Sequence, residues 1–234
     1  MAVKSPLPKN AVRDQRYIQI FNDIQRDKSY LEHPADIQET TWDSEIATRI
    51  DYAGRGCSYR PGRRNSTAPE IFLLGYDETS IEKTLCFIES LALDGIFKDC
   101  SFLMEGYDGT AAMISWVNPV TNPRLNGLFN KYAIMPCGKD SCDLRESQYS
   151  NLQEVDRLQR SASDEQRIKE KVVEAMDNLV KREREYFLPA VVKEKEKGRP
   201  ILFLANIVHA LSSNFPIVLN NNGMKYAVFV PTKY

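Results

Sequence analysis

Asn206–Tyr234, NIVHALSSNFPIVLNNNGMKYAVFVPTKY, is the last stretch of the sequence, and it restricts the range of possible folds more than any other stretch. No Asp, Glu, Lys or Arg occurs between Asn206 and Met224. The pattern predicts a short apolar helix end and then a β-hairpin, in which an Asn220–Gly223 turn joins Ile217–Leu219 to Lys225–Val230. Such a tail packs inside a fold or against a neighbouring subunit, so it belongs to the architecture of the protein.

The chain has 234 residues, of which 42% are hydrophobic, and this is enough for one large domain or two small ones. Its 31 basic residues balance 32 acidic ones. Proteins that hold nucleic acid by bulk electrostatics carry a basic surplus, which this chain lacks. A near-neutral chain suits close packing against copies of itself, although the same balance has no special meaning in most proteins.

The five cysteines and the N-terminus indicate a cellular compartment. The cysteines are Cys57, Cys86, Cys100, Cys137 and Cys142. An odd number, without a secretory signal in Met1–Asn10, predicts free thiols in a reducing compartment. No window reaches the roughly 18 apolar residues that a membrane span needs. We therefore expect a soluble intracellular protein.

Residues 1–28 are predicted to form an N-terminal helical arm. Asn10 caps a helix that runs to about Lys28, behind a leader that contains Pro6 and Pro8. Its apolar stripe consists of Val12, Tyr17, Ile18, Phe21 and Ile24. The helix is either a surface amphipathic helix or an arm that docks on another subunit, and the sequence does not choose between them.

Residues 29–234 are predicted to form a single α+β body. The predicted strands are Ser44–Tyr52, Ile71–Tyr76, Cys100–Glu105, Thr110–Val117 and Leu128–Met135, and Trp116 is expected in the core. Helices are predicted at Thr79–Leu93, around 163–187 and around 201–211. A capping box at Ser163–Gln166 opens the second helix, and Pro189 is expected to interrupt it.

Two stretches contain residues that could form a ligand site. Gly54–Pro69 is predicted to be a loop that carries Tyr59 and the arginines Arg55, Arg60, Arg63 and Arg64. Arginine beside an aromatic ring suits a phosphate or a base, but the glycines lack phosphate-loop spacing, which favours a solvated or intersubunit basic loop. Cys137 and Cys142 lack the further Cys or His pair that a zinc site needs.

The sequence offers no catalytic motif. Only His33 and His209 occur, and neither lies in a zinc-protease or nucleophile-elbow pattern. His209 stands among apolar residues, which favours a hydrogen-bonded packing role, and His33 precedes Pro34 in a loop. We therefore expect a protein that is not an enzyme, with no catalytic residues and no metal ligands.

One alternative comes from residues 71–136. Their predicted order of strand, helix, strand and strand is similar to an RNA-recognition motif, a fold that stacks bases on exposed aromatic rings. Phe72 and Trp116 would have to stack those bases, whereas Ala112 and Ile114 stand where further aromatics are needed. The match predicts a βαββ packing pattern more than RNA binding.

Both ends of the chain resemble the polyhedrins of cypoviruses. Arg13-Asp14-Gln15-Arg16 and Phe21-Asn22 resemble the N-terminal helix of that family. The residues similar to its C-terminal end are Ile207-Val208-His209, Asn214-Phe215-Pro216, Leu219, Asn221-Asn222 and Tyr226-Ala227-Val228. The chain length also fits the family, and the middle of the chain is weakly similar around Ser66–Leu85.

The resemblance implies the matrix protein of viral occlusion bodies. Its fold would be α+β, an antiparallel β-sandwich flanked by helices, with the N-terminal helix linking subunits. Its partners would be copies of itself, as trimers in an intracellular crystal, and the embedded virus particles, with no membrane and no specific nucleic acid. Its location would be occlusion bodies in the cytoplasm of an infected host cell.

Cofactor and pH behaviour follow from the same resemblance. Members of the family hold nucleotides, but none of their binding residues is matched here, so a bound nucleotide is possible, its site is unknown, and no cofactor is required. The sequence adds 11 tyrosines, which ionise near pH 10 as lysines lose their charge. Assemblies are therefore predicted to dissolve above about pH 10.

Overall fold

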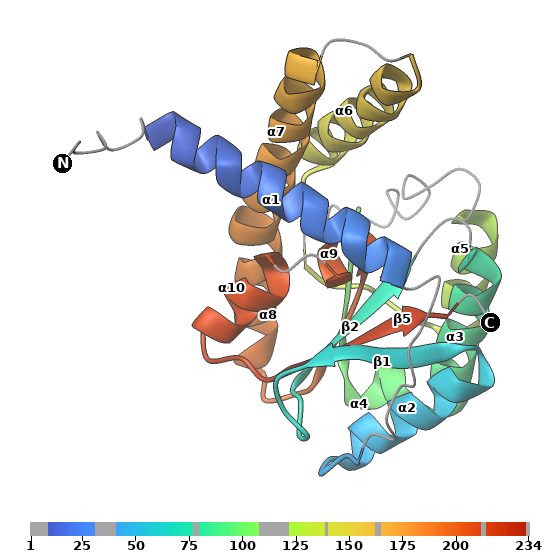
Figure 1. Ribbon diagram of the computed structural model, residues 1–234. Helices are drawn as coiled ribbons and strands as arrows, with labels where there is room; N and C mark the ends of the chain where they lie inside the picture. Colours follow the sequence, from blue (N-terminus) through green and yellow to red (C-terminus); the bar gives the residue numbers. More distant parts are fainter. Residues whose placement is uncertain are drawn as a thin grey trace.

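The computed structural model describes residues 9–30, 41–76, 80–107, 122–138, 140–161, 165–211 and 214–232. Its centre is a five-stranded sheet of strand order β1-β5-β2-β4-β3 (Figure 1). The strands are β1 (Tyr59–Arg64), β2 (Ile71–Tyr76), β3 (Ser101–Met104), β4 (Ile201–Asn206) and β5 (Tyr226–Pro231). β1 is antiparallel to β5, and the other three pairings are parallel.

The helices complete a mixed α/β fold. The helices in the first part of the chain are α1 (Lys9–Tyr30), α2 (Glu45–Gly56), α3 (Ile81–Leu93), α4 (Ile96–Asp99) and α5 (Asn122–Tyr132). After them follow α6 (Cys142–Arg160), α7 (Glu165–Arg182), the π-helix η3 (Glu183–Phe187), α8 (Leu188–Lys195), α9 (Ile207–Leu211) and α10 (Asn214–Asn221).

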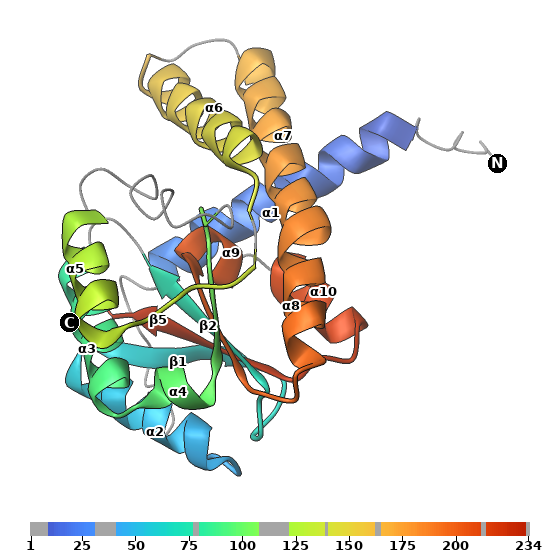
Figure 2. The same ribbon diagram turned by 180° about the vertical axis from the view of Figure 1, so that it is seen from behind.

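Helices cover both faces of the sheet, as the two opposite views show (Figures 1 and 2). Successive side chains of a strand point to opposite faces, so β2 contributes to two cores. Phe72 and Leu74 pack with residues of α2, α3 and α5, whereas Ile71 and Leu73 pack with residues of α8, α9 and α10. A parallel strand buried on both faces needs a continuous apolar run, and β2 (IFLLGY) and β4 (ILFLAN) are such runs.

The expected mixture of helices and strands is confirmed, but the antiparallel β-sandwich that the resemblance implies is not found in the described residues. They form a single sheet, and parallel pairing predominates in it. The physical reason is the length of the connections. Parallel neighbours need a crossover of a dozen residues or more, and the long stretch between the paired strands β3 and β4, which contains α5 to α8, supplies one.

The predicted C-terminal hairpin is wrong. Ile217–Leu219 lies inside α10, and only Tyr226–Pro231 is a strand. The Asn-Gly signal ends a helix instead of turning a hairpin, because Gly223 adopts a positive φ of 67°. The N–H groups of Gly223 and Met224 bond to the carbonyls of Asn220 and Leu219, at 2.9 and 3.0 Å, in the pattern of a Schellman motif.

Other elements are partly as predicted. The strands Ile71–Tyr76 and Cys100–Glu105 and the helix Thr79–Leu93 are confirmed as β2, β3 and α3. Ser44–Tyr52 and Leu128–Met135 were predicted as strands, but they lie largely in α2 and at the end of α5. Ser44 begins α2 because its hydroxyl accepts from the N–H of Ala47.

Three more predictions concern the rest of the chain. The helix around 201–211 is wrong in its first half, where β4 forms, and confirmed in its second half as α9. The helix around 163–187 is confirmed from Glu165 onward and continues past Pro189 through η3 and α8. The predicted strand Thr110–Val117, with Trp116, lies outside the described residues.

Most of the apolar stripe of α1 is buried within the same chain, whereas Val12 is 54% exposed. Tyr17, Ile20, Phe21 and Ile24 pack with α6, α7 and α9 in one cluster. The Tyr17 hydroxyl also donates to Asp177 on α7 at 3.0 Å. An intersubunit arm was predicted because the apolar stripe of this helix had no evident partner in its own chain. In the structure, α7 provides such a partner. Docking of residues 1–28 on another subunit stays a prediction.

Two of the five cysteines are not free thiols. Cys57, at the end of α2, forms a disulfide with Cys86 in α3, and this bond joins two helices of the same sheet face. Cys100 and Cys137 are free. The prediction of five free thiols is therefore wrong for this pair.

Candidate functional site

The carboxyl ends of β2, β4 and β3 lie side by side because these strands are parallel neighbours. In open α/β sheets, ligands bind at this edge. Glu105 directly follows β3, and α9, which carries His209, directly follows β4. This edge is where a fold of this type places its chemistry.

Arg182, at the end of α7, is the centre of a buried polar cluster at this edge. Its guanidinium has no exposed surface. It donates to both oxygens of Asp140 at 3.1 and 2.7 Å, to Glu105 Oε1 at 2.6 Å and to Gln148 Oε1 at 2.6 Å. Burial works to lower the pKa of Arg182, but Glu105 and Asp140 outweigh it and raise that pKa. Arg182 is therefore a permanent buried cation.

Glu105 links two strands at their carboxyl ends. Its Oε1 accepts from Arg182, and its Oε2 accepts from the backbone N–H of Asn206, the last residue of β4. Burial alone raises the pKa of a carboxyl group. The nearby Arg182 and His209 outweigh burial and hold the pKa of Glu105 well below its ordinary value. Glu105 is therefore a carboxylate although none of its side chain is exposed.

His209 is held in place by a second carboxylate. Its Nδ1 lies 2.9 Å from Glu183 Oε1, and the other oxygen of Glu183 accepts from the side-chain amide of Asn214. A carboxylate only accepts, so Nδ1 carries a hydrogen and donates it to Glu183. Glu183 thereby fixes both the orientation of the ring and its tautomer. Phe187 adds an edge-to-face ring contact with a centroid distance of 5.0 Å.

The Nε2 atom of His209 has a partner in either protonation state. It lies 3.2 Å from a terminal nitrogen of Arg182, which only donates, and 3.6 Å from Glu105 Oε1, which only accepts. A neutral ring accepts from Arg182, and a protonated ring donates toward Glu105. Burial lowers the pKa of His209, but Glu105 and the hydrogen bonds to Glu105 and Glu183 outweigh it and raise that pKa. The cluster therefore favours the imidazolium.

The charges of the cluster also favour a proton on His209. Its carboxylates are those of Glu105, Asp140 and Glu183, and its guanidiniums are those of Arg145 and Arg182. The imidazolium supplies the third positive charge against three negative ones. Because an uncompensated buried charge costs several kcal/mol, this balance stabilises the protonated ring.

An irregular turn brings Arg182 and Glu183 into the cluster. In η3 the N–H of Leu188 bonds to the carbonyl of Glu183, five residues back, as in a π-helix. In a regular α-helix, side chains five residues apart point in directions that differ by about 140°, so they do not meet. Here the guanidinium of Arg182 lies 5.2 Å from the ring of Phe187, five residues later. Single π-turns inside helices occur frequently at functional sites.

Tyr76, Arg145 and Tyr149 form the less buried side of the cluster. The Nε atom of Arg145 is 3.9 Å from Glu105 Oε1, its guanidinium lies over the ring of Tyr149 at 5.5 Å, and 14% of its side chain is exposed. Burial, and then the charge of Glu105, raises the pKa values of both tyrosines. Their hydroxyls are therefore neutral near pH 7.

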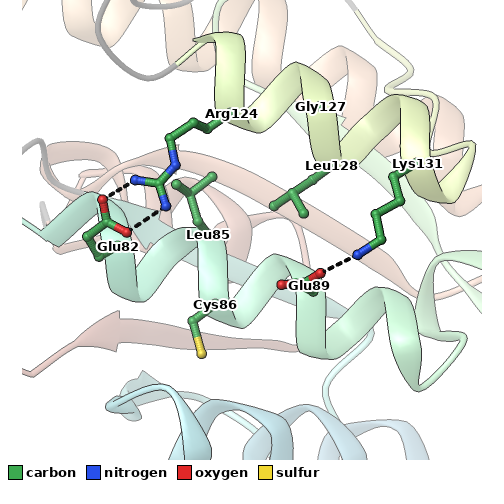
Figure 3. A pocket seen from close by; sticks show the side chains of 8 residues that line it. All are labelled: Glu82, Leu85, Cys86, Glu89, Arg124, Gly127, Leu128 and Lys131. Atoms are coloured by element: carbon green, nitrogen blue, oxygen red, sulfur yellow. Dashed lines mark hydrogen bonds and ion pairs between the residues drawn. The ribbon is translucent and has the colours of Figure 1, made fainter.

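A depression with a volume of about 390 Å³ lies between α3 and α5 (Figure 3). Leucine side chains form its floor, and two ion pairs span it. Glu82 accepts from both terminal nitrogens of Arg124, and Lys131 donates to Glu89 at 2.8 Å. These charged groups are exposed and already paired with each other, so this depression is a weaker candidate than the carboxyl edge.

His209 is the one residue considered in the sequence that the structure places in the cluster. Its predicted hydrogen-bonded packing is confirmed, and the charged partners were not predicted. His33 lies outside the described residues. Phe72 is fully buried, so it cannot stack a base, and parallel pairing of β2 also differs from the packing expected of an RNA-recognition motif.

Gly54–Pro69 was predicted to be a loop, but Arg55 lies in α2 and Tyr59–Arg64 forms the strand β1. Tyr59 is buried in β1 and donates to the carbonyl of Gly75 at 2.9 Å, so it is not beside a solvent-exposed ligand. Arg55 pairs with Asp51 at 2.9 Å, and Arg64 stacks on Trp42 with 5.1 Å to the ring centroid. Arg60 and Arg63 both donate to backbone carbonyls.

The described part of the chain contains neither a metal site nor a helix that could span a membrane. Cys137 is half-buried there, and the side chain of Cys142 lies outside it. No group of three or more His, Cys, Asp or Glu side chains in that part has the arrangement of a metal site. None of its helices has both the length and the apolar character needed to cross a bilayer.

Comparison of the chain with protein-family models, with curated proteins and with solved structures gives no match. The functional assignment therefore depends on the cluster itself. Arg182, Glu105 and Glu183 were missed in the sequence because ordinary surface helices and strand ends carry the same residue types. The one available signal was the position of Glu105, directly after the buried run Ser101–Met104.

Proposed function

We propose that this chain is an enzyme that acts on a small polar molecule by general acid–base catalysis at the carboxyl edge of its sheet. The main support is His209, whose Nδ1 is held by Glu183 while its Nε2 faces both a donor and an acceptor. A histidine placed in this way keeps its hydrogen bond to Glu183 in both protonation states. Histidine is also the side chain whose ordinary pKa lies nearest to neutrality.

Each member of the cluster has a role in this proposal. His209 exchanges the proton through Nε2, and Glu183 orients the ring and stabilises the imidazolium. Glu105, whose Oε1 lies 3.6 Å from Nε2, forms an ion pair with the protonated ring and stabilises it. Asp140 and Gln148 hold the guanidinium of Arg182 in place beside His209.

The cost of the cluster supports a role beyond stability. Removing an ion from water costs several kcal/mol, and apolar residues of similar volume are often as stabilising as a buried ion network. Groups with shifted pKa values gather at functional sites more often than elsewhere. This proposal departs from the non-enzyme that the sequence alone favours.

Chromogenic substrates test the proposal. Purified protein is incubated with p-nitrophenyl esters, p-nitrophenyl phosphate and p-nitroanilides, and the released chromophore is followed by absorbance. We expect turnover of at least one class, reduced about 10²–10⁴-fold in His209→Gln, which is the usual contribution of a general acid or base. Glu183→Gln should also lower the rate and alter the pH profile, because the ring loses its charged partner.

Lys131→Gln is the matched control, since Lys131 pairs with Glu89 away from the cluster. Its rate should equal that of the wild type. Circular dichroism of each variant separates loss of folding from loss of chemistry. Full turnover in a folded His209→Gln protein, or no turnover of any class by the wild type, would contradict the proposal.

A second candidate function is the occlusion-body matrix protein that both chain ends resemble. The observation that favours it is the resemblance itself, and its two parts meet in space, since Arg16 of α1 donates to Asn214 of α10 at 3.4 Å. The β-sandwich that the family implies is not found in the described residues. Expression in insect cells, with light microscopy for intracellular crystals, tests this function directly; cells without crystals would count against it.

A further inference from the structure

A cavity of about 400 Å³ opens at the opposite edge of the sheet from the acid–base cluster. We call it the amino-edge cavity, because Ser101 and Phe102, which begin β3, line it, whereas Glu105 follows the end of that strand. At about 3.3 Å per residue, four residues of strand separate the two sites by on the order of 13 Å. The inference below is therefore independent of the proposed function.

One wall of the amino-edge cavity is apolar. Phe97 and Phe102 line it and contact each other edge to face, with centroids 5.0 Å apart. Met135, at the mouth, is a large apolar side chain with 64% of its surface exposed. Ligand pockets of this size are typically lined by apolar and aromatic side chains with a few polar groups that fix orientation. A ligand with an apolar portion would cover this wall.

The other wall carries an excess of positive charge. The charged residues that line the cavity are Lys98, Lys197, Arg199 and Glu194. Lys197 pairs with Glu194 at 2.7 Å, which neutralises both charges. Arg199 donates to the backbone carbonyls of Lys98 and Asp99, and carbonyl contacts leave its charge uncancelled. Lys98 and Arg199 therefore give the rim two positive charges beside an apolar wall.

We propose that the amino-edge cavity binds an amphipathic carboxylate, with its apolar portion against Phe97, Phe102 and Met135 and its carboxylate at Arg199 and Lys98. The planar guanidinium of Arg199 matches the two oxygens of a carboxylate. Binding needs both halves, since an apolar ligand leaves the rim charge unused and a small ion leaves the wall exposed.

The two thiols of the cavity report on binding without reacting with the ligand. Burial raises the pKa of Cys137 to about 11 and that of Cys100 to about 12. Both are therefore neutral thiols at pH 7, which are weak nucleophiles. Cys137 is the less buried of the two, so its slow alkylation measures how open the cavity is.

Three probes separate the two halves of the site. Octanoate carries both charge and tail, 1-octanol carries only the tail, and acetate carries only the charge. By calorimetry at neutral pH, octanoate should bind at least about tenfold more tightly than either of the others, a factor that corresponds to one charge-assisted contact. Octanoate should also slow the alkylation of Cys137 by iodoacetamide, measured by mass spectrometry of the Cys137 peptide.

Variants then locate the binding. Arg199→Gln, which removes the rim charge, should weaken octanoate about tenfold and leave 1-octanol unchanged. Met135→Glu, which removes part of the apolar wall and adds an anion, should weaken both, and octanoate more than 1-octanol. Arg124→Gln, in the depression between α3 and α5, should bind octanoate as the wild type does. Equal affinity for octanoate and 1-octanol, unprotected Cys137, or no effect of Arg199→Gln would overturn the proposal.

Discussion

Arg182 shows how much a single residue contributes to this site. Its guanidinium has five N–H donors and no exposed surface, so every donor must find a partner inside the protein. Asp140, Glu105 and Gln148 provide acceptors, and the face of Phe187 lies against the cation. Removing Arg182 would leave two carboxylates buried without their main counter-charge, and this outcome costs far more than a lost surface ion pair.

We therefore predict that Arg182→Met lowers the free energy of unfolding by about 3–5 kcal/mol. Urea unfolding followed by circular dichroism measures it. Arg157→Met is the control, because the Arg157–Glu154 pair is exposed, and it should leave the stability almost unchanged. Adding Glu105→Gln to Arg182→Met removes one orphaned charge and should recover part of the loss. No recovery would mean that packing, rather than charge, makes Arg182 necessary.

His209 and Glu105 predict a pH range of greatest stability. The pKa of His209 is raised in the folded protein, so its contribution is complete below its unfolded value near 6.5 and is lost as the pH rises through the folded pKa. The pKa of Glu105 is lowered, so its contribution is complete above about pH 4.3 and is lost on acidification.

Stability should therefore fall on both sides of about pH 4.5–6.5. Urea midpoints between pH 3 and 9 measure the profile. The groups that face His209 are Arg182, Glu183, Glu105 and Asn214, and His209→Gln should flatten only the limb above pH 6.5. A profile of His209→Gln that keeps the wild-type alkaline slope would show that another group titrates there.

At the scale of elements, η3 is the feature that turns an ordinary helix into part of a site. α7 and α8 would form one continuous helix without it, and Pro189 explains why they do not. Proline lacks an N–H, and its ring collides with the carbonyl four residues earlier, which is that of Glu185. A π-turn just before Pro189 widens the helix at this place and also turns Glu183 toward His209.

Pro189→Ala should restore an α-helical hydrogen bond to Glu185 and weaken the π-turn. The Glu183–His209 contact then loosens, so the pKa of His209 should fall from its raised value toward the ordinary one. NMR titration of the imidazole carbons measures this shift, which a purely structural role of Pro189 would not produce. Lys193→Ala, an exposed change in α8, is the matched control. An unchanged His209 titration would mean that the π-turn persists without the proline.

At the scale of the whole molecule, the sequence predicted elements whose signals are local. Thr79–Leu93 carries a clear helical period, Ile71–Tyr76 is a short apolar run of strand length, and both formed as predicted. Ile201–Asn206 is an apolar run that fits a buried strand or a buried helix equally well, so its assignment needs the neighbouring strands. An Asn-Gly pair suits a hairpin turn and a helix C-terminus alike, because both use a positive φ.

The site was less accessible to sequence reasoning than the fold. Arg182 and Glu183 lie in the charged run Lys181–Tyr186, which has the composition of a solvated helix face. Only η3 and the parallel order of the sheet bring them to Glu105 and His209, which are distant in sequence. Contacts of this kind depend on the order in which strands pair, and no local pattern encodes that order.

The distribution of buried tyrosines across the molecule predicts its response to alkali. Tyr17, Tyr76, Tyr149 and Tyr226 lie on α1, β2, α6 and β5, and burial is the first cause that raises the pKa of each. In the unfolded chain tyrosine ionises near pH 10. The folded protein holds these protons to higher pH, so its stability is complete below about pH 10 and is lost as the pH rises through the folded values.

We predict cooperative unfolding of the single chain above about pH 10, followed by far-UV circular dichroism together with tyrosinate absorbance. The two signals should change together, because the buried hydroxyls ionise only when the fold opens. Tyr76→Phe removes one ionisation that favours the unfolded state, so it should raise the midpoint, whereas Tyr52→Phe, at a side chain that is 81% exposed, should not. The same unfolding would dissolve any assembly that the chain forms, which gives the predicted alkaline release a cause within the subunit. Ionisation of all tyrosines before any loss of circular dichroism would show that their burial does not couple to the fold.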